Sequence, residues 1–79
     1  MPTVLIIKGY RFFFYSQEGT EPIHIHVKKG NSIGKIWLEP VTEWDYHYGF
    51  TSREINSINN IVAENRAIII HKWNAYFRK

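Results

Sequence analysis

The sequence contains no cysteine, and none of its apolar runs is long enough to cross a membrane. Without cysteine the chain forms no disulfide, no cysteine-based metal site and no thiol nucleophile. Its first apolar run, Val4–Ile7, is far shorter than the roughly 20 residues that a membrane-spanning helix needs. No basic flank followed by a long apolar segment indicates a signal peptide. We therefore expect a cytoplasmic protein that makes no membrane contact.

Several catalytic signatures are also missing from the chain. There is no Gly-rich phosphate loop, no His-Glu-x-x-His motif and no nucleophile elbow. The serine and threonine residues fall mostly in predicted loops and caps. The sequence therefore nominates no residue for covalent catalysis, and we expect no cofactor.

Length and charge narrow the class of protein further. A chain of 79 residues makes a single domain, residues 1–79, with a modest core, so a homodimer or other oligomer contact would add stability. The hydrophobic content of 44% argues against disorder. The net charge of +3 permits contact with phosphate without requiring it.

The first half of the chain, residues 1–48, has the pattern of a small sheet. Thr3–Ile7 is rich in β-branched residues and Tyr10–Tyr15 is aromatic, which is typical of strands. Lys8-Gly9 between them fits a tight hairpin turn. Val41–Tyr48 is either an edge strand, with Thr42, Trp44, Tyr46 and Tyr48 on one face, or an aromatic loop. The sheet therefore has four to five antiparallel strands.

The last third of the chain predicts one amphipathic helix over residues 51–78. Thr51 and Glu54 have the spacing of a capping box. The apolar stripe that follows keeps one helix face and consists of Ile55, Ile58, Val62, Ile69, Trp73 and Tyr76. Asn65 interrupts this stripe and predicts a kink or break. The fold class is therefore α+β, with a small antiparallel sheet packed on one C-terminal helix.

The segments Ile23–Lys29 and Ser32–Leu38 flank Gly30-Asn31, a two-residue turn pair. If that turn sets the register, one side of the hairpin carries the apolar pairs Ile23–Leu38, Ile25–Ile36 and Val27–Gly34. The other side carries the pairs His24–Trp37, His26–Lys35 and Lys28–Ile33. Because side chains alternate along a strand, a slip of one residue would destroy this separation. We therefore predict an apolar face toward the helix and an imidazole-and-cation face toward water.

The second of these faces carries the candidate chemistry. A histidine titrates near neutral pH, so His24 and His26 beside Lys35 have the groups for metal-independent RNA cleavage. A metal site is the minority alternative, because His-x-His needs further ligands and no spacing nominates Glu21, Glu39, His47 or His71. The simplest alternative is structural: both histidines are half-exposed sheet residues, and His24 stacks on Trp37.

Nucleic-acid binding without chemistry is a further hypothesis for the same face. Trp37, with Tyr15 or Phe13, would stack bases. The cations that would follow the phosphates are Arg11, Lys28, Lys29 and Lys35. The alternative is a cross-strand aromatic cluster that stabilises the sheet.

Several blocks of the chain carry a family resemblance. They are Met1 to Val4, Gly9 to Ser16, Glu21 to Val27, Lys35 to Val41, Gly49-Phe50, Glu64-Asn65-Arg66 and Trp73-Asn74. Together they resemble the prokaryotic domain-of-unknown-function family 4160. The resemblance implies a small bacterial or archaeal cytosolic protein whose gene commonly neighbours another small gene, in a toxin–antitoxin-like module. It supplies no catalytic residues.

The chain departs from the family pattern at two places. Trp44–Tyr48 is unusually aromatic, and Gly34 stands where a small side chain is more familiar. Our leading hypothesis is a toxin–antitoxin-like component that binds or cleaves RNA through the His24, His26, Lys35 and Trp37 face. The alternative is a non-enzymatic module that docks a cognate small protein, encoded nearby, through an apolar belt widened by Ile68 to Ile70.

Overall fold

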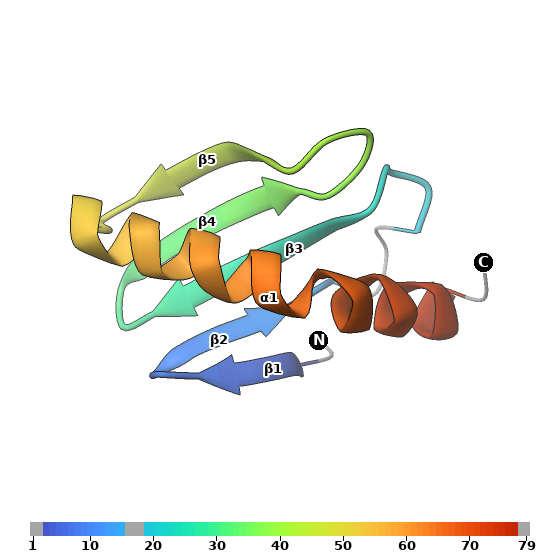
Figure 1. Ribbon diagram of the computed structural model, residues 1–79, viewed down its shortest axis with the longest axis horizontal. Helices are drawn as coiled ribbons and strands as arrows, with labels where there is room; N and C mark the ends of the chain where they lie inside the picture. The colour runs from blue at the N-terminus through green and yellow to red at the C-terminus, as the bar shows by residue number, and fades with distance from the viewer. Residues whose placement is uncertain (1–2, 16–18, 78–79) are drawn as a thin grey trace.

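The computed structural model describes residues 3–15 and 19–77. The strands are β1 (Thr3–Ile7), β2 (Tyr10–Phe13), β3 (His24–Lys29), β4 (Ser32–Trp37) and β5 (Glu43–Tyr48), and the helix is α1 (Ser52–Phe77). The five strands form one antiparallel sheet in the order β1-β2-β3-β4-β5, so each strand pairs with its neighbour in sequence (Figure 1). The predicted α+β class is confirmed. The helix begins one residue later than predicted, and the predicted last residue, 78, lies outside the described residues.

The two tight hairpin turns set the registers of the β1–β2 and β3–β4 pairs. Lys8 and Gly9 have φ values of 54° and 83°, and positive φ at both positions is the type I′ geometry that matches strand twist. Gly30, with φ of 60°, begins the β3–β4 turn. The predicted pairs between these strands are all present, and the Leu38 N–H donates to the Ile23 carbonyl at 2.8 Å.

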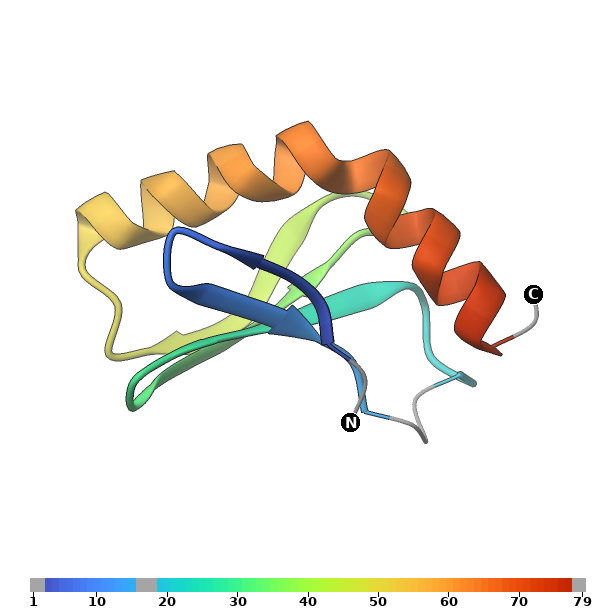
Figure 2. The ribbon, with the colours of Figure 1, turned by 90° about the horizontal axis from the view of Figure 1, so that it is seen from below.

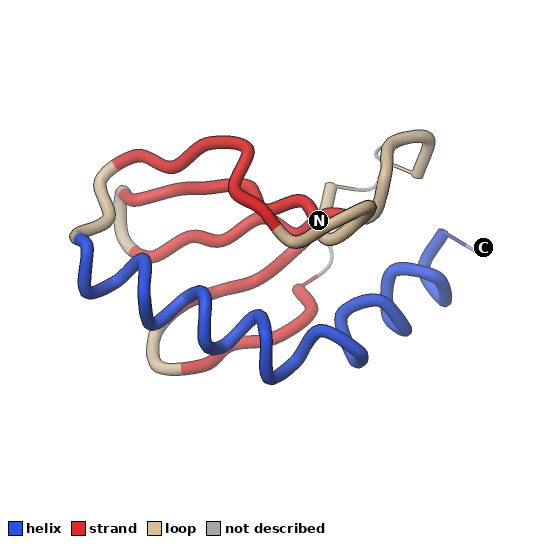
Figure 3. Tube along the Cα trace, turned by 45° about the horizontal axis from the view of Figure 1, so that its top comes forward, coloured by secondary structure: helices blue, strands red, loops and turns tan. Residues whose placement is uncertain are grey.

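The helix covers one face of the sheet and leaves the other bare (Figures 2 and 3). Ile25, Val27 and Ile36 lie on the covered face, where they pack with Ile58 and Ile69 of α1. Burial of these apolar side chains is the main source of the fold's stability. The apolar face of the hairpin therefore meets the helix, as the register predicted.

Helix α1 is capped and bent as its sequence indicates. The Thr51 N–H donates to Glu54 Oε1 at 2.9 Å, and the Glu54 N–H donates to Thr51 Oγ1 at 3.1 Å, which completes a capping box. The axis changes direction near its middle (Figure 2), where Asn65 Nδ2 donates to the Ile61 carbonyl at 2.8 Å. Side-chain bonds to a carbonyl one turn earlier are associated with helix bending.

Strand β5 is present, but its faces differ from the prediction. The β4–β5 register shifts between Lys35 and Ile36, so that Tyr46 lies opposite Lys35 whereas Trp44 lies opposite Ile36. This irregularity inserts one extra residue and turns the side chains before it to the other face. The prediction that Trp44 shares a face with Tyr46 and Tyr48 is therefore wrong. The Trp44 indole N–H instead donates to Asn59 Oδ1 of α1 at 2.8 Å.

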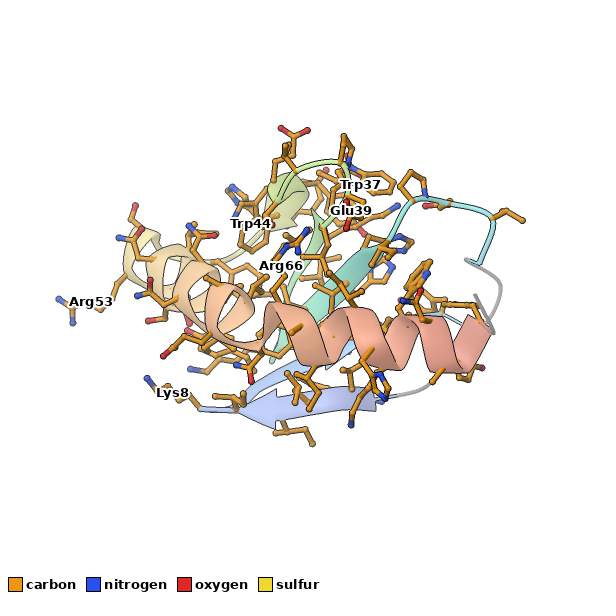
Figure 4. All side chains as sticks on the ribbon, turned by 45° about the vertical axis from the view of Figure 1, so that its right-hand side comes forward. Lys8, Trp37, Glu39, Trp44, Arg53 and Arg66 are labelled. Carbon is orange, nitrogen blue, oxygen red and sulfur yellow. The ribbon has the colours of Figure 1, made fainter. Side chains whose placement is uncertain are left out.

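Arg66 ties the helix to the connection between β4 and β5. Its Nη2 donates to the Leu38 carbonyl at 2.7 Å and to Glu39 Oε1 at 3.3 Å, and its Nε donates to Thr42 Oγ1 at 3.3 Å. Figure 4 shows the Arg66 side chain reaching from α1 toward Glu39. A planar guanidinium can serve several acceptors at once, so one side chain fixes this connection.

Candidate functional site

The uncovered side of the sheet, which we call the open face, carries the candidate residues in three cross-strand rows. The first row is Ile6, Arg11, Lys28, Ile33 and Tyr48. The second is Phe13, His26, Lys35 and Tyr46. The third is His24, Trp37 and Glu43. Since directly opposite residues share a face of the sheet, the strand pairing itself brings most of the predicted site residues together.

The two histidines are buried on this face. His24 is 0% exposed and His26 is 5% exposed. Neighbouring rings enclose His26: Phe13 stacks on it at 5.5 Å between centroids, and Tyr15 meets it edge-on at 4.7 Å. The expectation that the imidazoles face water is therefore corrected. Aromatic neighbours bury both rings, and for His24 these neighbours include Trp73 of α1.

His24 lies where the sheet meets the C-terminal half of the helix. Its ring contacts Trp37 of β4 at 5.3 Å and Trp73 of α1 at 5.0 Å between centroids. Its Nδ1 lies 2.9 Å from the Pro22 carbonyl, so in the neutral ring Nδ1 carries the proton and donates. A general acid or base must come within hydrogen-bond reach of its substrate, and a ring this enclosed does not.

Lys35 is already balanced by carboxylates. Its Nζ donates to Glu21 Oε1 at 2.9 Å and lies 3.8 Å from Asp45 Oδ2. The same ammonium lies 4.2 Å from the centroid of the Trp37 ring. An ammonium paired in this way is a poor partner for a phosphate, because the neighbouring carboxylates repel the ligand.

The first row is the basic and accessible part of the open face. Arg11 and Lys28 lie directly opposite each other across β2 and β3, and the Lys28 side chain is exposed. The Arg11 guanidinium lies 5.4 Å from the centroid of Phe13. Tyr48 ends the row and is 64% exposed. Two adjacent cations can bind an anion, and the exposed ring in the same row can stack on a planar group attached to that anion.

Lys29 does not belong to the open face. Its Nζ lies 4.7 Å from the centroid of the Tyr10 ring and 3.9 Å from Glu54 Oε2 of the helix. Strand alternation places it with Val27 on the covered face. Trp37 does lie on the open face, but it is half-buried between His24 and Lys35.

Metal-ligand clusters and membrane-spanning helices were sought among the described residues. Within residues 3–15 and 19–77, no three His, Asp or Glu side chains group as ligands for an ion. Of the predicted extra ligands, Glu21 lies 3.8 Å from His24 Nδ1, while His47 packs on Trp44. In the same part of the chain, α1 lacks the apolar length that crossing a bilayer requires.

A family model for a domain of unknown function matches residues 9–74 of the 79-residue chain. The chain belongs to the DUF4160 family. The match spans β2 to β5 and most of α1, and therefore includes every open-face residue named above except Ile6, together with the Arg66 contacts. Comparisons with curated proteins and with solved structures found no match.

Tyr46 and Tyr48 are open-face residues that the sequence did not predict. Their spacing predicts that the two tyrosines share a face of β5. Which face they share depends on the β4–β5 register, and no turn residue in the sequence marks the bulge in that register. The sequence also predicted no role for Arg66. Its position next to the buried stripe of α1 is the only sequence feature that suggests a structural contact, and that feature is weak by itself.

Proposed function

We propose that this DUF4160 protein binds single-stranded RNA on its open face, as a cytoplasmic component of a toxin–antitoxin-like module. The observation that carries the proposal is the placement of Arg11 opposite Lys28 on the uncovered side of the sheet. Adjacent cations on a sheet favour a bridging anion such as a phosphodiester. The exposed ring of Tyr48 in the same row supplies a surface on which a base stacks.

The proposal is binding rather than cleavage. Metal-independent cleavage needs proton donors and acceptors beside the scissile phosphate. His24 is 0% exposed, and Lys35 is held by Glu21 at 2.9 Å. The contacts of both imidazoles with aromatic rings give them a structural role in packing. The gene-neighbour pairing implied by family membership supports the module context.

The test is the affinity of oligouridine for the wild type and for matched variants, measured by fluorescence anisotropy at several salt concentrations. Lys28→Gln should weaken binding and lower the slope of log affinity against log salt by about 0.7, the value for one phosphate contact on a single strand. Lys72→Gln is the control. It removes the same charge from α1 and keeps a donor near the Val4 carbonyl, 3.3 Å from the native ammonium.

The stacking part of the proposal has its own matched pair. Tyr48→Leu should cost about 1–3 kcal/mol of binding free energy, the range for one stacked base. Tyr76→Leu removes a ring that is 45% exposed on α1 and should leave the affinity unchanged. Equal weakening by Lys28→Gln and Lys72→Gln would show non-specific attraction to a basic protein and would refute the site. Absence of binding at low salt would refute the function.

A second candidate function is docking of a cognate small protein, or of a second copy as a homodimer, on α1. Ile68 is 43% exposed, and the exposed ring of Tyr76 lies on the same helix. The belt is narrower than the sequence suggested, because Ile69 is buried and Ile70 packs against the core. Ile68 is therefore the position at which a charge would disturb a partner and spare the fold.

A further inference from the structure

A hollow of about 200 Å³ opens at the end of the molecule away from the hairpin turns. Its walls are the indole of Trp37 and the rings of Pro22 and Pro40, and the carboxylates of Glu39 and Glu43 complete the lining. The lining residues come from the entry to β3, the exit of β4 and the start of β5. Flat apolar walls combined with carboxylates suit a ligand that is both planar and cationic.

This end of a basic protein is acidic. Four of the seven acidic residues in the chain are Glu21, Glu39, Glu43 and Asp45, and each contacts or lines the region around Trp37 and Lys35. Cations gather at the opposite end, where Figure 4 shows Lys8 and Arg53 far from Trp37 and Glu39. Lys35 and Arg66 lie among these four carboxylates, so the formal charge of this end stays negative and favours a cation over a phosphate.

The carboxylates of this end differ in what they already bind. Glu21 accepts from Lys35 at 2.9 Å, and Glu39 lies 3.3 Å from Arg66 Nη2. Glu43 is exposed and makes no ion pair within the part of the chain that the structure describes. Glu43 is thus the carboxylate with its charge available to an incoming group.

We propose that this hollow binds an arginine side chain from a basic segment of a partner polypeptide. The guanidinium would stack on the part of the Trp37 indole that lines the hollow and pair with Glu43. Lys35, whose ammonium lies 4.2 Å from the centroid of the same ring, does not line the hollow. Arginine fits better than lysine, because its planar and weakly hydrated head stacks on rings and bonds a carboxylate through two donors. The site is separate from the proposed RNA surface, since it lies in the third row and Arg11 and Lys28 lie in the first.

The test is an NMR titration of the full chain with the peptide acetyl-Gly-Arg-Gly-Arg-Gly-amide, with its lysine counterpart in a parallel titration. The indole N–H signal of Trp37 should shift, and the lysine peptide should bind more weakly. Glu43→Gln should weaken the arginine peptide about threefold to fivefold, the upper range for an exposed ion pair. Glu64→Gln removes an equal charge from the exposed side of α1 and should change nothing.

Several results would overturn the inference. One is an unmoved Trp37 signal at millimolar peptide, and another is equal weakening by Glu43→Gln and Glu64→Gln. Equal binding of both peptides would exclude the stacked guanidinium. Signals that shift with protein concentration in the absence of peptide would identify a second copy as the occupant, and would also refute it. Because no RNA is present, these outcomes are independent of the RNA test, and Lys28→Gln should bind the peptide normally.

Discussion

Replacing Gly34 with alanine should destabilise the protein, although alanine normally suits a strand better than glycine. A Cβ built at Gly34 would lie 2.6 Å from Trp44 Cζ3 and 3.1 Å from the Tyr46 carbonyl oxygen. A separation of 2.6 Å is well inside van der Waals contact, so one group must move. The indole is not free to do so cheaply, because its N–H bonds Asn59 Oδ1 at 2.8 Å.

The magnitude follows from opposing contributions. Gly→Ala at an unstrained position stabilises by about 0.4–1 kcal/mol, because the unfolded chain loses entropy. Overpacking costs about 1–3 kcal/mol, and loss of the indole hydrogen bond costs about 1 kcal/mol. The net expectation is a destabilisation of about 1–3 kcal/mol. Because these costs exceed the entropic gain, the substitution is expected to destabilise the protein.

The assay is urea unfolding followed by far-UV circular dichroism, for Gly34→Ala, Trp44→Leu and the double variant. In the Trp44→Leu background the contact with the indole is removed and only the 3.1 Å approach to the Tyr46 carbonyl remains, so Gly34→Ala should become clearly less destabilising. Effects of the two single changes that add within about 0.5 kcal/mol would refute the contact, as would a Gly34→Ala variant more stable than the wild type. The same contact links Gly34 to the aromatic segment of β5, because the Trp44 indole occupies the space that a side chain at position 34 would need.

Two further predictions concern the helix. Arg66→Ala should lower the free energy of unfolding by about 1–2 kcal/mol, because it removes the hydrogen bonds of a partly exposed cation to Leu38 and Thr42. Arg53→Ala, which replaces an exposed arginine on the same helix, should change the free energy of unfolding by less than about 0.5 kcal/mol. Equal effects of the two variants would contradict this role of Arg66. Ile68→Glu should leave the unfolding midpoint nearly unchanged but abolish any complex with a cognate partner in size-exclusion chromatography, and a complex that survives would exclude docking at this position.

The sequence predicted the elements that depend on local chemistry. Gly30-Asn31 sets the β3–β4 register, and the alternation of side chains then fixes which residues share a face. The same alternation already indicated that Lys29 lies on the apolar side with Val27, although it was grouped with the open-face cations. The capping box at Thr51 and the bend at Asn65 are local in the same sense.

Other features depend on residues distant in the sequence. The burial of His24 depends on Trp73, which lies near the other end of the chain. The position of Trp44 depends on a bulge, which no turn residue marks. The pairing of Lys35 with Glu21 and Asp45 joins three separate segments. Because of these contacts, the residues expected to transfer protons are buried among aromatic rings or paired with carboxylates. The first row of the open face is therefore the accessible surface.

The most direct test of the central claim, that the open face is the functional surface, is an NMR titration of the protein with oligouridine at low salt. We expect the largest amide shifts at Arg11, Lys28 and Tyr48, with little change along α1. Shifts concentrated on α1, or none at millimolar oligonucleotide, would contradict it.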